Sequence, residues 1–264
     1  TAQAAQELCA HLDCVSVERI EEELAKLLSA PAPAAYLDEK ILSVVLPELS
    51  PEALAAAKPV VDACPAGEQA LPVRLAALLL SLGEDGTRRT LRRLRCSNAR
   101  IEETAVLVRE VVSGVPVAFS SDTNRAIPSP ALLPAATGSH PSGRSSEKLP
   151  ARPPVSMNIY ARRLLGKYNL CTVQRLAALG TALQPERAAE FAKLSQLAER
   201  LDADGVCCRV SQLAVNGRDL MAAGVPAGPG IRKVLEALLD GVIREEYPNE
   251  RQALLAAVQQ LAAS

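Results

Sequence analysis

Apolar side chains recur at helical spacing along most of the chain. In the first clear example, Val17, Ile20 and Leu24 share one face. Ser16 stands before them as an N-cap, and Pro31 follows where the helix should end. The same pattern predicts helices over 16–29, 34–45, 52–63, 71–82, 87–95, 98–112, 157–168, 172–180 and 185–201, with three more beyond residue 215. No segment shows the alternation of a strand, so we predict an all-α fold, an elongated multi-helix array.

The helical pattern is interrupted once, between residues 113 and 156. This window is rich in Ser, Pro and Gly and has no periodic apolar spacing, which is typical of a flexible insertion or linker. It divides the predicted array into two helical parts joined by a flexible loop. We therefore predict helical domains over 1–112 and 157–264, separated by the segment 113–156.

Residues 216–233 predict a helical hairpin. Asn216 is a natural N-cap for a short first helix, and Gly224 stands where that helix should close in a left-handed conformation. Pro229 suits the first turn of the helix that follows. One apolar stripe then continues along that helix through Ile231, Val234, Leu235, Leu238, Leu239 and Val242.

The second helix of this hairpin begins with features that favour an anion. Arg232 and Lys233 add positive charge to the exposed amides and the dipole of its first turn. Gly228 and Gly230 would let a backbone phosphate approach closely. The alternative is a plain hairpin whose glycines only make the turn.

The strongest local charge lies between residues 87 and 100, where six arginines occur without an acidic residue. They are Arg88, Arg89, Arg92, Arg93, Arg95 and Arg100, and we call them the arginine cluster. Leu91 and Leu94 are expected to face inward, so the arginines project outward. Like charges at this spacing repel, and a nucleic-acid backbone would relieve the repulsion. The alternative is a solvated face partly neutralised by Glu102 and Glu103.

The composition limits how nucleic acid could be bound. Only 2% of the 264 residues are aromatic and none is Trp, which argues against base stacking as the main binding mode. The net charge is −1, so affinity for nucleic acid must come from local patches. Leu, Ala and Val must build the core, in keeping with closely packed helices.

No motif indicates catalysis. The seven cysteines are scattered without a CxxC pair, and we read them as reduced thiols of a cytoplasmic protein. Only two histidines are present, and Asp202 with Asp204 is better explained as a solvated turn than as a Mg²⁺ site. No apolar run is long enough to cross a membrane. We therefore predict no catalytic residue, no metal ligand and no membrane partner.

Several segments, taken in order, resemble the bacterial CCA-adding tRNA nucleotidyltransferases and their poly(A) polymerase relatives. The helix 18–28 resembles the family's neck helix, and the segments near residues 74–79 and 91–98 are similar to its body. The run 215–221 resembles its tail. The residues that carry the resemblance are Glu18-Arg19-Ile20-Glu21-Glu22-Glu23-Leu24, Leu46-Pro47-Glu48-Leu49, Arg74-Leu75-Ala76-Ala77-Leu78-Leu79, Leu91-Arg92-Arg93-Leu94-Arg95-Cys96-Ser97-Asn98, Val215-Asn216-Gly217-Arg218-Asp219-Leu220-Met221, Gly224, Gly228-Pro229-Gly230 and Asn249.

The resemblance implies neck, body and tail without the family's catalytic head, since only 16 residues precede the neck-like helix. It implies tRNA as the partner and a separately encoded or detached head that would supply Mg²⁺ and bind nucleoside triphosphates. RNA binding would then fall on the arginine cluster with Asn98, and on Asn216, Gly228, Gly230, Arg232 and Lys233. Two other functions stay open, a helix-hairpin-helix module that binds duplex DNA and a catalytically inactive helical scaffold.

Overall fold

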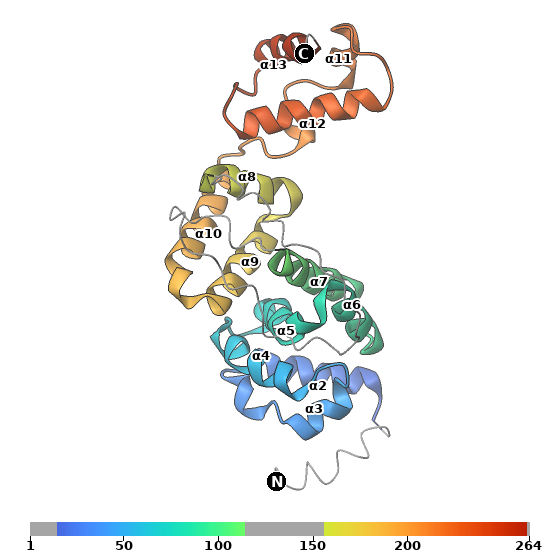
Figure 1. Ribbon diagram of the computed structural model, residues 1–264, viewed down its shortest axis with the longest axis vertical. Helices are drawn as coiled ribbons and strands as arrows, with labels where there is room; N and C mark the ends of the chain where they lie inside the picture. The colour runs from blue at the N-terminus through green and yellow to red at the C-terminus, as the bar shows by residue number, and fades with distance from the viewer. Residues whose placement is uncertain (1–14, 114–155, 263–264) are drawn as a thin grey trace, which may run out of the picture. The chain divides into compact units, whose positions relative to one another are not determined.

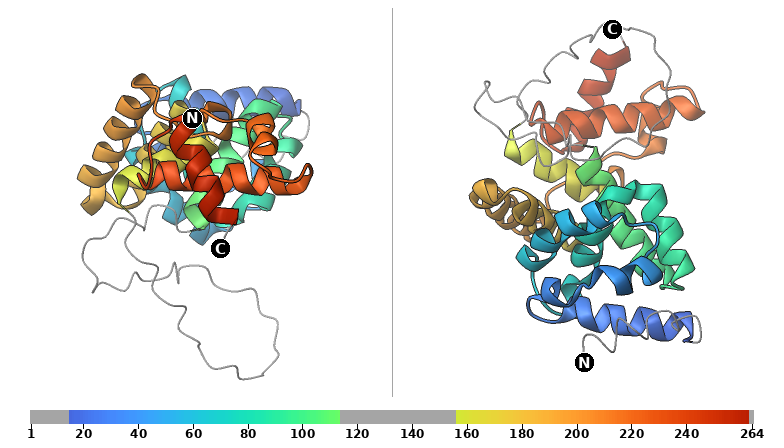
Figure 2. Two further views of the ribbon diagram at one scale, coloured as in Figure 1. Left: turned by 90° about the horizontal axis from the view of Figure 1, so that it is seen from above. Right: turned by 60° about the horizontal axis from the view of Figure 1, so that its bottom comes forward.

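The computed structural model describes residues 15–113 and 156–262. Within these ranges the chain consists of helices and their connections, and no strand occurs in them (Figures 1 and 2). The prediction of an all-α fold is confirmed. The interior of the predicted 113–156 linker falls outside the described residues.

The described residues form two compact units. The first takes residues 15–113 and 175–191, and the second takes 156–174 and 192–262. The division passes through two helices, α9 (Leu170–Leu183) and α10 (Ala188–Ala203).

The first unit is built around one fully buried helix, α5, all of whose residues are buried. Such burial follows from the sequence of α5, which is apolar on every side apart from Arg74. Helices α2, α4 and α7 pack against it (Figure 1). In chain order the elements are α2 (Val17–Ser29), the 3₁₀ turn η2 (Pro33–Tyr36), α3 (Glu39–Val45), α4 (Pro51–Ala63), η3 (Glu68–Ala70), α5 (Leu71–Leu79), η4 (Leu80–Leu82), α6 (Gly83–Arg93), α7 (Asn98–Val112), the second part of α9, η6 (Pro185–Arg187) and the start of α10.

Arg74, the one charged residue of α5, forms hydrogen bonds to the ends of two neighbouring helices, α2 and α4. Its side chain is almost fully buried, and its hydrogen bonds go to backbone carbonyls. Nη1 donates to the carbonyls of Leu28 (2.6 Å) and Ala30 (2.5 Å) at the end of α2, and Nη2 donates to that of Cys64 (3.1 Å) at the end of α4. The last carbonyls of a helix have no partner within it and carry partial negative charge, so the guanidinium satisfies both ends at once.

Serine side chains cap the first turns of α2 and α7. The Ser16 and Ser97 hydroxyls accept from the amides of Arg19 and Arg100, as expected of N-caps. The predicted helix over 34–45 divides instead into η2 and α3, because the Asp38 carboxylate caps a new helix.

The start predicted at Thr87 for the arginine-bearing helix is wrong, because α6 already begins at Gly83. Glu84 and Asp85 lie in its first turn, where the helix dipole favours negative charge. Thr87 is fully buried, and its hydroxyl donates to the Leu79 carbonyl (3.4 Å).

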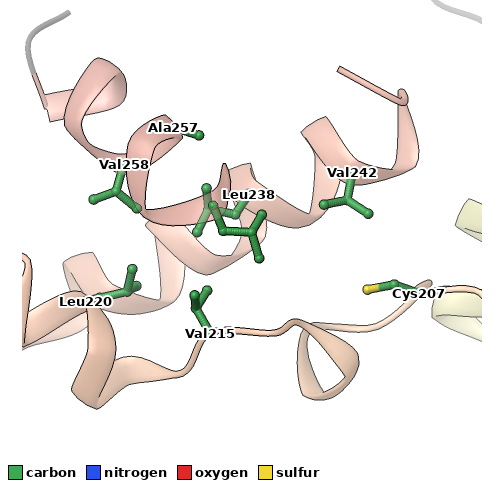
Figure 3. Close-up of a cluster of buried hydrophobic side chains, with 8 residues drawn as sticks. Cys207, Val215, Leu220, Leu238, Val242, Ala257 and Val258 are labelled. Carbon is green, nitrogen blue, oxygen red and sulfur yellow. The ribbon is translucent and has the colours of Figure 1, made fainter. Parts of the chain in front are cut away.

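The second unit holds the C-terminal helices around their own apolar core (Figure 3). Besides its parts of α9 and α10, it contains α8 (Met157–Lys167), η7 (Val210–Gln212), α11 (Gly217–Ala222), α12 (Pro229–Ile243) and α13 (Arg251–Ala262). Leu220 of α11, Leu238 of α12 and Leu254 of α13 are each fully buried in that core. The remaining stripe residues of α12 pack against the same cluster, which confirms the predicted apolar face.

Polar contacts fix the ends of α12 and α13. The side-chain amide of Asn249 donates to the backbone carbonyl of Gln212 and accepts from the backbone amide of Ala214 (both 2.9 Å). These two hydrogen bonds hold the segment before α11 against the start of α13. Arg163 of α8 pairs with Asp240 (2.7 Å), and Arg162 of α8 also holds the end of α12.

Candidate nucleic-acid interface

The arginines of α6 lie away from the buried face of the helix. Leu91 and Leu94 are at most 2% exposed, as predicted, and Thr87 and Thr90 are fully buried beside them. The cluster therefore lines the outer side of α6, the turn that follows it and the first turn of α7. Asn98, the first residue of α7, is exposed there, and its neighbour Ser97 provides the cap.

Four arginines of the cluster are engaged by carboxylates, and three of those acids come from distant parts of the chain. Arg95 pairs with Glu18 and Arg100 with Glu21, both acids on α2. The two residues of each pair are 77 and 79 positions apart in the sequence. The guanidinium groups of Arg95 and Arg100 are therefore paired with acids, although no acid lies between residues 87 and 100.

Arg93 forms a bidentate ion pair with Glu48. Its Nε and Nη2 donate to the two carboxylate oxygens of Glu48 at 2.7 and 2.8 Å, and Nη2 also donates to the Val45 carbonyl at 2.9 Å. The hydrogen bonds from Arg93 lower the pKa of Glu48. A bidentate pair of this kind holds α6 against the end of α3 and leaves Arg93 little capacity for another anion.

Arg88 lies between two carboxylates of the α6–α7 pair. Its Nη2 donates to Glu84 (3.0 Å), Nη1 donates to Glu102, and only 19% of its side chain is exposed. The hydrogen bond from Arg88 lowers the pKa of Glu102. Glu103, the other acid expected to neutralise the cluster, pairs with Arg175 (3.0 Å).

Arg89 and Arg92 differ from the other four. Both are exposed, and neither guanidinium group forms a hydrogen bond or an ion pair with any residue in the described ranges. They stand three residues apart, so they lie on neighbouring turns of one helix side. Their guanidinium groups are the part of the cluster that is open to an external phosphate.

The predicted hairpin of α11 and α12 is present with its expected caps. The Asn216 side chain accepts from the amides of Arg218 (2.8 Å) and Asp219 (3.3 Å), and Asp219 accepts in return from the Asn216 amide (3.0 Å). Gly224 ends the first helix with φ +94° and Gly228 precedes the second with φ +142°, both in regions that favour glycine.

The first turn of α12 is exposed. Gly230 has open space around its Cα, and Lys233 makes no ion pair with a described residue. Arg232 is strongly exposed but already pairs with Glu236 (2.8 Å), one turn further along α12. Among the described residues, Arg218 and Lys233 are therefore the exposed cations of the hairpin without an ion pair, whereas Arg232 is partly neutralised by Glu236.

Among the described residues, no group of three or more His, Cys, Asp or Glu side chains could hold a metal ion. Burial raises the pKa of the Cys64 and Cys96 thiols to about 11, so neither is activated. A hollow beside Cys208 and Arg209 measures about 40 Å³, far less than a ligand pocket requires. A search of the described helices finds none long and apolar enough to cross a membrane.

Comparison with known proteins gives two family matches at different ends of the chain. Residues 156–258, which include the α11–α12 hairpin, match the family described as tRNA nucleotidyltransferase domain 2. Residues 1–52, which include α2 and α3, match the family described as "Probable RNA and SrmB- binding site of polymerase A". The arginine cluster lies between the two matched ranges.

A curated relative agrees with these matches. The CCA-adding enzyme of Levilactobacillus brevis is 52% identical over 46 residues, an alignment that spans 17% of this chain and 12% of that enzyme. No solved structure matches the chain.

In two separate ranges the chain is therefore similar to regions of tRNA nucleotidyltransferases and poly(A) polymerases, one of them described as RNA-binding. The similarity to a CCA-adding enzyme agrees with this, and it concerns the C-terminal-type region of that family.

Proposed function

We propose that this chain holds tRNA so that its 3′ end can be extended by a nucleotidyltransferase head supplied outside these 264 residues. The observation that carries the proposal is the pair of family matches, one to an RNA-binding region and one to a tRNA nucleotidyltransferase domain. Because aromatic residues are scarce, we expect the chain to bind the phosphate backbone of the RNA and not to stack on its bases.

Arg89 and Arg92 are the side chains we propose for the strongest phosphate contacts. Their guanidinium groups are exposed and unpaired within the described residues, so a phosphate can bind them without breaking an existing ion pair. Asn98 and Arg100 flank them, and Arg100 is partly shielded by Glu21. The hairpin would add a second contact through Asn216, Gly228, Gly230, Arg232 and Lys233.

The direct test replaces Arg89 and Arg92 together by alanine. Because each phosphate contact releases counterions, the double variant should bind a tRNA transcript more weakly. The slope of log K against log salt should fall by about 1.4 to 1.8, from about 0.7 to 0.9 for each lost contact. Fluorescence anisotropy at several salt concentrations measures both quantities.

The matched control removes two other cations of the same unit, Lys40 and Lys58, as K40A/K58A. Neither lysine forms an ion pair with a described residue, so the net charge changes equally and no known contact is lost. The control should keep most of the affinity and the slope. Equal losses in the two double variants would show that overall charge, and not the α6 surface, governs binding.

A second candidate function is duplex DNA binding by the α11–α12 hairpin. Its glycine-rich loop and the exposed first turn of α12 favour that function, because backbone amides there can reach a phosphate. The match of the same residues to a tRNA nucleotidyltransferase domain favours tRNA instead.

A further inference from the structure

The turn that closes α6 places an arginine where glycine is usual. Arg95 has φ +56°, in the left-handed region. Its amide donates to the Arg92 carbonyl (3.0 Å), and the Cys96 amide donates to the Leu91 carbonyl (3.0 Å), the pattern of a helix end that glycine normally occupies. A side chain in this conformation is strained, so helix ending by itself would favour glycine over arginine at this position.

The ion pair of Arg95 is also the most exposed one in the arginine cluster. The side chains of Arg95 and Glu18 are 65% and 52% exposed, whereas those of Arg100 and Glu21 are 31% and 18% exposed. An exposed pair is screened by water and contributes little to stability. The Arg95 guanidinium can therefore exchange one anionic partner for another more readily than Arg88, Arg93 or Arg100.

The position of Arg95 continues the open surface of α6. It comes three residues after Arg92, which itself comes three residues after Arg89, and it carries the charge past the end of the helix. Glu18 is in the first turn of α2, so the carboxylate that meets Arg95 belongs to the segment matched to an RNA-binding region.

We propose that Glu18 is a built-in competitor of RNA: its carboxylate occupies Arg95 in the free protein, and an RNA phosphate replaces it on binding. This inference rests on the proposed function. Arg95 then becomes a third phosphate contact beside Arg89 and Arg92. The Glu18 carboxylate limits affinity, since every bound RNA must displace it.

The test compares E18Q with E23Q in binding to a tRNA transcript. Glu23 lies on the same helix, is similarly exposed and pairs with Lys26 (2.9 Å), so E23Q removes the same charge without touching the arginine cluster. E18Q should bind about 2- to 5-fold more tightly than E23Q, the range expected for releasing an exposed ion pair. Equal affinities of the two variants would overturn the inference.

A second variant, R95G, removes the side chain at a position whose backbone suits glycine, so folding is expected to survive. R95G should bind the transcript more weakly, with a salt slope smaller by about 0.7 to 0.9. In the R95G background, E18Q should lose its advantage over E23Q. An advantage that persists there would show that Glu18 acts through general charge and not through Arg95.

The outcomes separate this inference from the proposed function. If the unaltered chain does not bind the transcript, the proposed function fails. If R89A/R92A weakens binding while E18Q matches E23Q, the proposed function stands and the competition by Glu18 is refuted. Far-UV circular dichroism of each variant confirms that the helices are retained.

Discussion

Replacing Arg74 by methionine is expected to lower the free energy of unfolding by about 3 to 5 kcal/mol. Methionine fills a similar volume, so the loss reports the hydrogen bonds and not a cavity. The carbonyls of Leu28, Ala30 and Cys64 would lose the donor that now satisfies them. Urea denaturation followed by far-UV circular dichroism measures the change.

The size of this effect comes from the position of Arg74 at two helix ends. Carbonyls that end a helix need a partner, and those bonded to Arg74 lie in or near a core that water does not readily reach. Lysine keeps the charge but lacks the planar fork, so R74K should recover only part of the stability.

The matched control for this substitution is R92M, which changes the same residue type at an exposed, unpaired position of the same unit. Surface changes of this kind usually stay within about 0.5 kcal/mol. If R74M were no more destabilising than R92M, the bonds from Arg74 would not hold the ends of α2 and α4.

Replacing Gly166 by alanine is expected to destabilise the second unit by about 1 to 3 kcal/mol, the usual cost of overpacking. A methyl group at Gly166 of α8 would overlap the backbone carbonyl of Cys208, which cannot rotate away as a side chain could. Arg209 fixes that segment by donating to the carbonyls of Leu165 and Tyr168 (both 3.2 Å).

The informative result is whether G166A raises or lowers the stability. Glycine to alanine within a helix normally adds up to about 1 kcal/mol of stability. Gly230 of α12 has nothing within 4 Å of an added Cβ, so G230A should follow that ordinary trend. Thermal unfolding followed by circular dichroism compares the pair. If G166A and G230A were both more stable than the unaltered protein, α8 would not contact Cys208 closely.

Local signals in the sequence predict much of this fold. Ser16 and Asn216 cap their helices as predicted, because a cap depends on the few amides beside it. The apolar stripe of α12 is confirmed for the same reason, since it needs only regular spacing along one helix. The division of 34–45 depends on Asp38, itself a capping residue that could have been recognised.

The partners of the arginine cluster could not be predicted in the same way. Glu18, Glu21 and Glu48 reach their arginines only because α2 and the end of α3 pack beside α6 and its turn, and no local pattern specifies that packing. Arg74 shows the same limit, because its helical neighbours indicate a buried helix but not which carbonyls would meet its side chain. Contacts that join distant segments require the tertiary structure.

The central claim, that this chain holds tRNA, is tested most directly by its preference between two nucleic acids. Anisotropy titrations of the unaltered chain should compare a tRNA transcript with a DNA duplex carrying the same number of phosphates, at one salt concentration. We predict tighter binding to the tRNA than to the duplex, although both carry the same number of phosphates. Equal or tighter binding to the duplex would contradict the claim and favour the DNA-binding hairpin.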